Sequence, residues 1–485
     1  MKLPNIQLAF ACLAAAAVAL AADWPQLQCD AAHTGYTPDQ PSHPFSVKWV
    51  RDLDQPTQAS LQPIVADGKV FVGTGRGNLL ALDRVTGKTL WTHKTGAPIL
   101  ASAAWHRGLV LVTSMDHCCH AVRSADGTPV WTFETGEGIW AAPVVADGRV
   151  FVAGRDGFVY ALDPATGKEL WRAEVGGLVL TTPACADGRL YVGAGDMHVY
   201  AFDARTGKEV WKSERLPAAA MREYWLVAAR GTVVATTQPA FASHTIQGFI
   251  MKGVMNPFNE RTKGDPVLVE DAVFPELVKW FQAHPSHKSW HVLDAKTGRE
   301  KFIAPVIGVN GGSCTAPPPA VAPDGFAYTV YANVWLTASG WAFFGRVNLA
   351  TGQLEPLIRD RYAPKLAHPK QWHWQPKAGT AFDRSSTWNG GFSVIDQSWG
   401  VSIGGDLAFP VRDPAWPGNP PFNNTFNIRT REDRYLIPDL GRRRGLGRHG
   451  TFGAGFHNTC SAVAISGKQL FHKTPRSVLV AFEGK

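Results

Sequence analysis

A nine-residue pattern that returns at a constant spacing limits what this chain can fold into more than any other feature. It occurs as DRVTGKTLW at Asp83–Trp91, as DPATGKELW at Asp163–Trp171 and as DARTGKEVW at Asp203–Trp211. A weaker copy ends at Trp131, so four tryptophans follow one another at intervals of 40 residues. A constant period of this length indicates one supersecondary unit copied in tandem.

Each copy of the pattern is typical of a β-hairpin. An apolar alternating run reaches the Asp, passes through a Thr-Gly step and resumes as a short strand that ends in Trp. Asp can cap such a turn, Gly can take a positive φ, and β-branched or aromatic residues favour the strands. The Trp is expected to pack against the neighbouring unit. We therefore predict a structural role in blade docking for Asp83, Gly87, Trp91, Trp131, Asp163, Gly167, Trp171, Asp203, Gly207 and Trp211.

Four strands in about 40 residues are typical of a propeller blade. Four units are clear between residues 67 and 211, a fifth reaches its turn only at Asp294–Gly298, a sixth ends near Asn348–Gly352, and a seventh is degenerate. The strand at Phe45–Leu53 lacks the strands that should precede it, and the C-terminal segment from Cys460 lacks the final Trp. The sequence therefore predicts an all-β fold: a single closed β-propeller of about eight four-stranded blades, with the N-terminal strand completing the last blade.

The N-terminus predicts export. Lys2 precedes an apolar run that ends at Ala22, with small residues where a signal peptidase cleaves. We expect a signal peptide at 1–22, one propeller domain at 23–485, and a periplasmic or secreted protein. The polar segment at 22–39 is expected to lie across the surface.

An insertion at about 239–287 is predicted in blade five, with a short helix at Pro275–His284 that begins at its proline. After the N-terminal run, no segment is apolar for long enough to span a membrane.

Cysteines and charge exclude some functions. Six cysteines follow Cys12, so disulfides are allowed with open connectivity, and no CxxCH motif exists to attach a haem covalently. The net charge is +8, but the basic residues are scattered, and their densest cluster, at Arg442–Arg448, lies in a Gly-rich stretch typical of a solvated loop. We expect no nucleic-acid partner, and a monomer.

The extended motif Ala-x-Asp-x-x-Thr-Gly-x-x-x-Trp resembles the docking motif of the quinoprotein-type, or pyrroloquinoline-quinone-like (PQQ-like), β-propeller family. It is complete at Ala81–Trp91, Ala161–Trp171 and Ala201–Trp211, and partial at Arg123–Trp131 and Asp294–Phe302. The family contains periplasmic quinone-dependent dehydrogenases and also non-catalytic members, such as the propeller lipoproteins of the outer-membrane β-barrel assembly machinery. The resemblance implies the fold. The motif meets turn and packing demands in either kind of member, so it does not imply a cofactor.

A quinoprotein dehydrogenase would need a Ca²⁺ site of carboxylate and amide oxygens, an Asp as base, and walls above and below the quinone ring. The pair Cys118-Cys119 invites comparison with the vicinal disulfide that caps the cofactor in alcohol-oxidising members. It falls inside the third strand of its unit, which favours packing cysteines. The run His117–His120 also suggests a soft metal site. Adjacent strand residues point to opposite faces, however, so these four cannot converge without a bulge, and we predict no metal site.

Ligands of propellers usually meet the loops that lead into the innermost strands, because these loops surround the central funnel. Their polar and aromatic residues form the predicted ligand or partner rim: Gln58, Trp140, Arg222, Tyr224, Asn310, Cys314, Asn389 and His457.

Three functions remain open, and no catalytic residue is assigned. The favoured one is an exported, non-catalytic binding or scaffold protein of the cell envelope, which meets an envelope protein or small ligand through the rim and the insertion. The alternative is a PQQ- and Ca²⁺-dependent dehydrogenase of small alcohols or sugars, with Glu137, Asn310 and Asn389 as metal ligands and an unassigned Asp as base. A third is polysaccharide binding by exposed aromatic residues.

Overall fold

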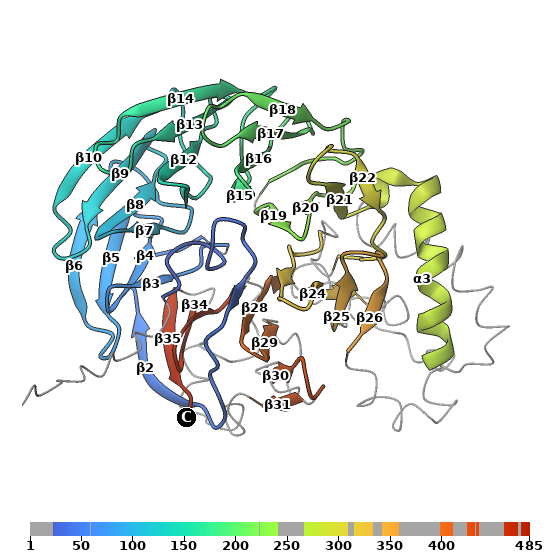
Figure 1. Cartoon of the computed structure of the whole chain (residues 1–485). Helices are drawn as coiled ribbons and strands as arrows, with labels where there is room; N and C mark the ends of the chain where they lie inside the picture. Colours follow the sequence, from blue (N-terminus) through green and yellow to red (C-terminus); the bar gives the residue numbers. More distant parts are fainter. Residues whose placement is uncertain are drawn as a thin grey trace, which may run out of the picture.

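The computed structural model is a closed ring of eight β-sheets (Figure 1), as the repeat predicts. It describes residues 23–58, 60–222, 224–240, 266–308, 315–332, 342–357, 398–410, 424–431, 433–435, 460–473 and 477–485. The prediction of a single propeller of eight four-stranded blades is confirmed.

The first four blades are regular antiparallel meanders whose strands run outward from the centre. Blade one holds β3 (Ile64–Ala66), β4 (Lys69–Gly73), β5 (Asn78–Asp83) and β6 (Thr89–Lys94). Blade two holds β7 (Ala104–His106), β8 (Leu109–Thr113), β9 (Cys118–Arg123) and β10 (Pro129–Glu134). Blade three holds β11 (Val144–Ala146), β12 (Arg149–Ala153), β13 (Phe158–Leu162) and β14 (Glu169–Glu174). Blade four holds β15 (Ala184–Ala186), β16 (Arg189–Gly193), β17 (Val199–Asp203) and β18 (Glu209–Lys212).

The next three blades depart from the 40-residue period. Blade five holds β19 (Val227–Ala229), β20 (Thr232–Thr236), β21 (Trp290–Asp294) and β22 (Glu300–Phe302). Blade six holds β23 (Ala320–Val321), β24 (Phe326–Ala332), β25 (Ala342–Asn348) and β26 (Leu354–Pro356). Blade seven holds β28 (Val401–Gly404), β29 (Leu407–Pro410), β30 (Asn424–Asn427) and β31 (Asp433–Tyr435). A two-stranded parallel sheet joins β27 (Ser398–Trp399) to β32 (Cys460–Ser461).

Blade eight joins the two ends of the chain. It holds β33 (Ala464–Ser466), β34 (Gln469–Lys473) and β35 (Val478–Glu483), and its outermost strand is β2 (Ser46–Asp52). Because β2 pairs antiparallel with β35, the predicted completion of the last blade by the N-terminal strand is confirmed. This closure removes two free sheet edges.

A tryptophan on the outermost strand of one blade packs against the turn glycine of the next. A Cβ atom added at Gly127 would lie 2.6 Å from the ring of Trp91, and a Cβ atom added at Gly167 would lie 2.6 Å from the ring of Trp131. The indole nitrogen of Trp91 donates to the Ser124 carbonyl at 3.0 Å. The motif therefore requires glycine for two reasons, the positive φ of the turn and the closeness of the ring. The same contact joins Gly87 to Trp49, Gly207 to Trp171, Gly298 to Trp211 and Gly352 to Phe302.

The aspartate of each motif holds the turn that carries this glycine. Asp163 Oδ1 accepts hydrogen bonds from the Thr166 N–H at 2.9 Å and from the Thr166 hydroxyl at 2.8 Å. These bonds from Thr166 lower the pKa of Asp163. Asp83 and Asp203 make the same contacts.

The insertion in blade five carries α3 (Pro266–Ala283) and a 3-10 turn, η2 (Pro285–His287). The prediction that the helix begins at Pro275 was wrong, because the helix starts nine residues earlier and holds this proline inside. A proline interrupts only one helical hydrogen bond, and packing of the last two turns offsets that cost. There, Leu277 and Phe281 are fully buried.

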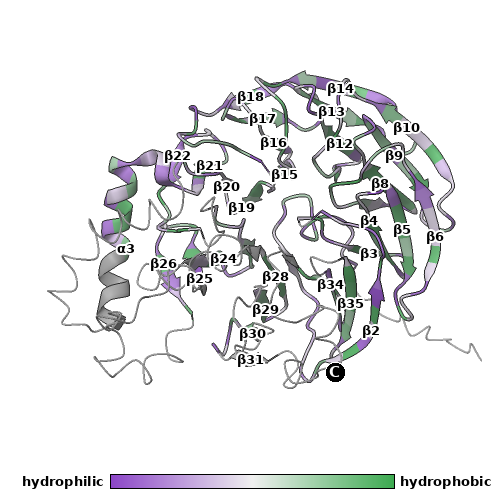
Figure 2. Cartoon of the chain, turned by 180° about the vertical axis from the view of Figure 1, so that it is seen from behind, coloured by the Kyte–Doolittle hydropathy of each residue, from purple (hydrophilic) through white to green (hydrophobic). Residues whose placement is uncertain are grey.

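The core lies within and between the blades. Figure 2 shows hydrophobic residues along β5 and β35, whereas the outer strand β6 mixes hydrophobic and hydrophilic residues. Strands covered on both faces read as continuous apolar runs, whereas an outer strand alternates. Among the described residues, no helix has the length and apolar character needed to cross a membrane.

Candidate functional site

The central channel is occupied by the residues that precede the first blade. Residues 23–37, named here the channel segment, pass round the axis and end in β1 (Tyr36–Thr37), which pairs in parallel with β28 (Figure 1). The prediction that residues 22–39 lie across the surface was therefore wrong: Trp24, Gln28, His33 and Thr37 are all fully buried or nearly so.

The channel segment accepts backbone hydrogen bonds from the innermost strands of successive blades. Each of these strands leaves backbone N–H groups on its inner edge that need an acceptor when they are buried. Carbonyls of the segment accept the N–H groups of Val65 at 2.8 Å, Trp105 at 2.7 Å, Cys185 at 2.7 Å, Ala228 at 2.9 Å, Val321 at 2.7 Å and Ile403 at 2.7 Å. In blade three a side chain does the same: Gln26 accepts from the Val145 N–H at 3.0 Å and donates to its carbonyl at 3.3 Å. One short stretch thus connects seven blades.

Gln62 links the channel segment to both ends of the ring. Its side-chain oxygen accepts the Trp24 indole N–H at 3.1 Å and the Gln28 backbone N–H at 2.8 Å. Its side-chain nitrogen donates to the carbonyl of Val463, which lies just before β33 of blade eight, at 3.1 Å. Because all these groups are buried, each bond replaces one that water would otherwise supply.

Burial sets the protonation of the polar groups in the channel segment. Burial lowers the pKa of His33 to about 4. The hydrogen bond from its ring Nδ1 to the Leu226 carbonyl, at 2.8 Å, acts in the other direction and raises that pKa, but burial has the larger effect. Burial also raises the pKa of Asp30, although Thr34 donates its backbone N–H to that carboxylate at 2.9 Å. The buried surroundings of His33 therefore favour the neutral form of its imidazole.

This neutral histidine predicts a loss of stability in acid. The unfolded chain protonates His33 near pH 6.5 and the folded chain near pH 4, so its contribution is complete above pH 6.5 and declines as the pH falls through this window. The decline should reach about 3 kcal/mol by pH 4. Urea unfolding of the wild type and of His33→Asn, which keeps an N–H donor but does not titrate, measures it. Equal pH dependence in the two proteins would rule His33 out as the source.

A small cavity on the funnel side is bounded by the channel segment and by three predicted rim loops. Its volume is about 20 Å³, and it is lined by Leu27, Ser60, Leu100, Ala101, Ser102, Trp140, Ala142, Leu180, Thr182, Tyr224 and Trp225. We name it the rim cavity. Its lining residues carry no charge, and the volume suffices for about one water molecule.

The structure brings together only part of the predicted rim. Trp140 and Tyr224 both line the rim cavity. Gln58 is half-buried nearby, where its carbonyl accepts the Leu61 N–H at 3.2 Å. Arg222 is exposed, and Glu137 is exposed as well. Asn310, Cys314, Asn389 and His457 lie outside the described residues.

A larger hollow lies on the outer wall, between α3 and the edges of blades five and six. It has a volume of about 860 Å³, and we name it the outer groove. Its lining is mixed: Phe274, Pro275, Val278, Gln282, Glu300, Phe302, Ile303, Pro305, Thr351, Gly352, Gln353, Leu354, Glu355, Pro356 and Arg431. Ion pairs fix part of it, since Arg431 lies 2.8 Å from Glu355.

The comparisons with known proteins agree with this architecture. The family model described as "Outer membrane protein assembly factor BamB" matches residues 46–142 and 118–246. No curated protein sequence matches the chain.

Solved structures with the same fold include two dehydrogenases. The quinohemoprotein alcohol dehydrogenase of Comamonas testosteroni is 13% identical, with a TM-score of 0.55 over 96% of this chain and 81% of that one. A europium-containing methanol dehydrogenase is 12% identical, with a TM-score of 0.52 over 95% and 98%. BamB from Moraxella catarrhalis is 13% identical, with a TM-score of 0.43 over 90% and 99%. For the two dehydrogenases, identities this low make the likeness one of fold alone. Residues 46–246 match the family model and the described residues form a ring of eight blades, so the chain is similar to the PQQ-like β-propellers in its repeat sequence and in its fold.

Proposed function

We propose that this protein is an exported, non-catalytic binding propeller of the cell envelope, which holds a partner protein in the outer groove and at the funnel rim. The observation that carries the proposal is the channel segment. It occupies the axis of the propeller with buried, hydrogen-bonded residues and leaves a rim cavity of about 20 Å³. Small-molecule sites usually measure about 300–1,000 Å³.

The rim cavity is too small to hold a quinone cofactor. A tricyclic quinone needs a slot many times larger than the rim cavity, and its Ca²⁺ needs carboxylate oxygens. The residues that line this cavity are apolar, hydroxyl-bearing or aromatic. Glu137, the carboxylate considered for that ion, is exposed and does not line it.

The outer groove supports the binding role. Its volume of about 860 Å³ lies within the range of ligand sites, and Phe274, Val278 and Phe302 give it apolar walls. Glu300, Glu355 and Arg431 add charged groups to the lining. An apolar floor with a polar border is the usual anatomy of a protein interface. The partner we infer is an extended segment of an envelope protein that carries apolar side chains.

Site-specific crosslinking tests the proposal. A photoreactive residue at Val278 should capture one discrete envelope protein, and adding Phe274→Asp should reduce the yield at least about tenfold, since a buried carboxylate opposes apolar contact. The matched control is the same photoreactive residue at Val85, which is 59% exposed on a turn far from the groove in sequence and should capture nothing discrete.

One pair of results would overturn this proposal. In the first result, photoreactive residues at Val278 and at Trp140 give no adduct. In the second, the protein binds pyrroloquinoline quinone with Ca²⁺ saturably and reduces a dye with alcohols or aldoses. The protein would then be the quinone-dependent dehydrogenase that the family resemblance allows.

A further inference from the structure

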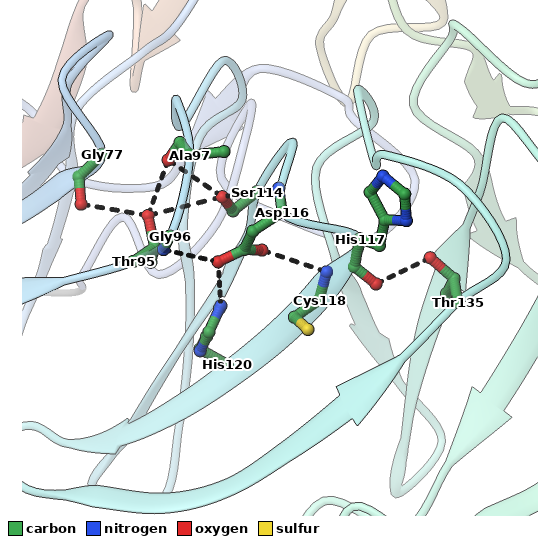
Figure 3. A network of polar contacts seen from close by, with 10 residues as sticks. All are labelled: Gly77, Thr95, Gly96, Ala97, Ser114, Asp116, His117, Cys118, His120 and Thr135. Carbon is green, nitrogen blue, oxygen red and sulfur yellow. Dashed lines mark hydrogen bonds and ion pairs between the residues drawn. The ribbon is translucent and has the colours of Figure 1, made fainter.

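Three side chains with metal-binding chemistry share one face of blade two. Asp116 lies in the turn before β9, Cys118 and His120 lie in β9, and one ligand atom from each is within 4.8 Å of the others. Figure 3 shows Asp116 between the other two. Cys118 and His120 are two residues apart in the strand and therefore point the same way, and the turn places the Asp116 carboxylate within hydrogen-bond distance of both residues. Cys119 points into the core and is fully buried.

Sister blades use the same position differently. In blades three and four an Asp is followed four residues later by a Tyr, whose hydroxyl donates to it: Tyr160 to Asp156 at 2.7 Å and Tyr200 to Asp196 at 2.5 Å. Blade two keeps the Asp but carries His120 in place of Tyr, with Nε2 at 3.0 Å from Asp116 Oδ2. Cys118 stands where blade three has Phe158.

Blade two also lacks the lysine that blade four places beside the corresponding aspartate. In blade four Lys212 pairs with Tyr200 across the strands, and its Nζ lies 3.2 Å from Asp196. The residue paired with His120 in the same way is Thr132, which is neutral. Asp116 therefore keeps its charge without the lysine that balances Asp196.

A second imidazole, that of His93, lies against this cluster from blade one. The rings of His93 and His120 have centroids 5.8 Å apart. The Nε2 atom of His93 is buried with no hydrogen-bond partner, and the backbone of Gly127 hydrogen bonds to the ring. At the next blade interface Phe133 packs on Tyr160 in the corresponding position. Of these two interfaces, only the one between blades one and two therefore places two histidine rings against each other.

The cluster is oriented and accessible. Asp116 accepts the Gly96 N–H at 2.7 Å through Oδ2 and the Cys118 N–H at 3.1 Å through Oδ1. Such backbone bonds fix a carboxylate in the way that outer-shell partners fix metal ligands. The His120 and Asp116 side chains are 14% and 15% exposed, which leaves a path for an ion.

We propose that Asp116, Cys118 and His120 bind one Zn²⁺ ion, with His93 as the fourth ligand from the neighbouring blade. A thiolate, two imidazoles and a carboxylate are the ligand types that zinc takes in tetrahedral sites. Binding would release the Cys118 thiol proton and would clamp blades one and two together at the position where other blades use a tyrosine hydroxyl.

Cobalt spectroscopy of the full, reduced and chelator-treated protein tests this site. One equivalent of Co²⁺ should produce a thiolate-to-metal charge-transfer band, and one equivalent of Zn²⁺ should abolish it. His120→Tyr restores the Asp–Tyr pair of the sister blades, so the protein should fold, and it should lose the band with a fall in affinity of about 100-fold or more. His93→Phe, which introduces the ring that Phe133 supplies at the next interface, should weaken binding by about 10–100-fold.

The two neighbouring thiols give a matched pair of controls. Cys118→Ser should lose the charge-transfer band, whereas Cys119→Ser, on the opposite face of the same strand, should keep both the band and the stoichiometry. Zn²⁺ should raise the thermal midpoint of the wild type and not that of His120→Tyr. The proposal fails if no saturable binding of one equivalent occurs, or if His120→Tyr and Cys118→Ser bind as the wild type does.

Discussion

Replacing Trp24 with Ala should lower the free energy of unfolding by about 3–5 kcal/mol, the usual cost of removing a large buried aromatic side chain. Trp24 has no exposed surface, and its backbone exchanges two hydrogen bonds of 2.8 Å with Val65 on β3. Its indole N–H is one of three groups bonded by Gln62. The substitution therefore opens a cavity and leaves a buried amide oxygen with one partner fewer.

Equilibrium unfolding in urea measures the effect of this substitution. Trp24→Phe keeps most of the ring and loses the indole hydrogen bond, so it should cost less than the alanine variant. Val85→Ala, at a side chain that is 59% exposed, should change stability by no more than about 0.5 kcal/mol. A loss below about 1 kcal/mol in Trp24→Ala would mean that the channel segment does not stabilise the ring.

The repeat made most of the fold predictable. Hairpins around Asp83, Asp163 and Asp203 follow from local chemistry, since an Asx-type cap and a glycine at positive φ are needed wherever such a turn is made. The closing strand β2 could also be predicted, because two incomplete units at the two ends of a cyclic repeat can only complete each other.

The channel segment could not be predicted in this way. Its polar residues, such as Gln26, are typical of a surface loop, and Gln26 is buried because the backbone of Val145 on an inner strand pairs with its side chain. The signal that was available was indirect: the innermost strand of each blade has a free edge, and a free edge inside a closed ring needs an acceptor. The need for these acceptors follows from the fold and not from the segment's own sequence.

The cluster in blade two shows a different limit. The prediction for His117 to His120 considered four adjacent side chains and left out Asp116, which lies in the turn before β9. Counting back from His120 in steps of two gives Cys118 and then Asp116, and only a comparison between blades shows that blades three and four carry tyrosine where blade two has His120. His93 comes from another blade, so no local pattern could include it.

The docking glycines supply the second large effect. Gly167→Ala should destabilise the protein by about 2–5 kcal/mol. Part of this, about 1–2 kcal/mol, is the cost of a side chain at φ +70, and the rest is overpacking, since the new Cβ would lie 2.6 Å from Cδ2 and Cε3 of Trp131. The indole cannot move away freely, because its nitrogen donates to the Pro164 carbonyl at 2.9 Å.

Gly148 provides the matched control for this effect. It also has a φ of +70, but a Cβ atom there would meet nothing within 4 Å, so Gly148→Ala should show the backbone cost alone, about 1–2 kcal/mol. The difference between the two variants in urea unfolding therefore isolates the contact between blades, and combining Gly167→Ala with Trp131→Ala should recover part of it by removing the ring. Equal losses in the two single variants would mean that the ring and the turn can move apart at little cost, and that the tryptophan motif does not hold the blades together.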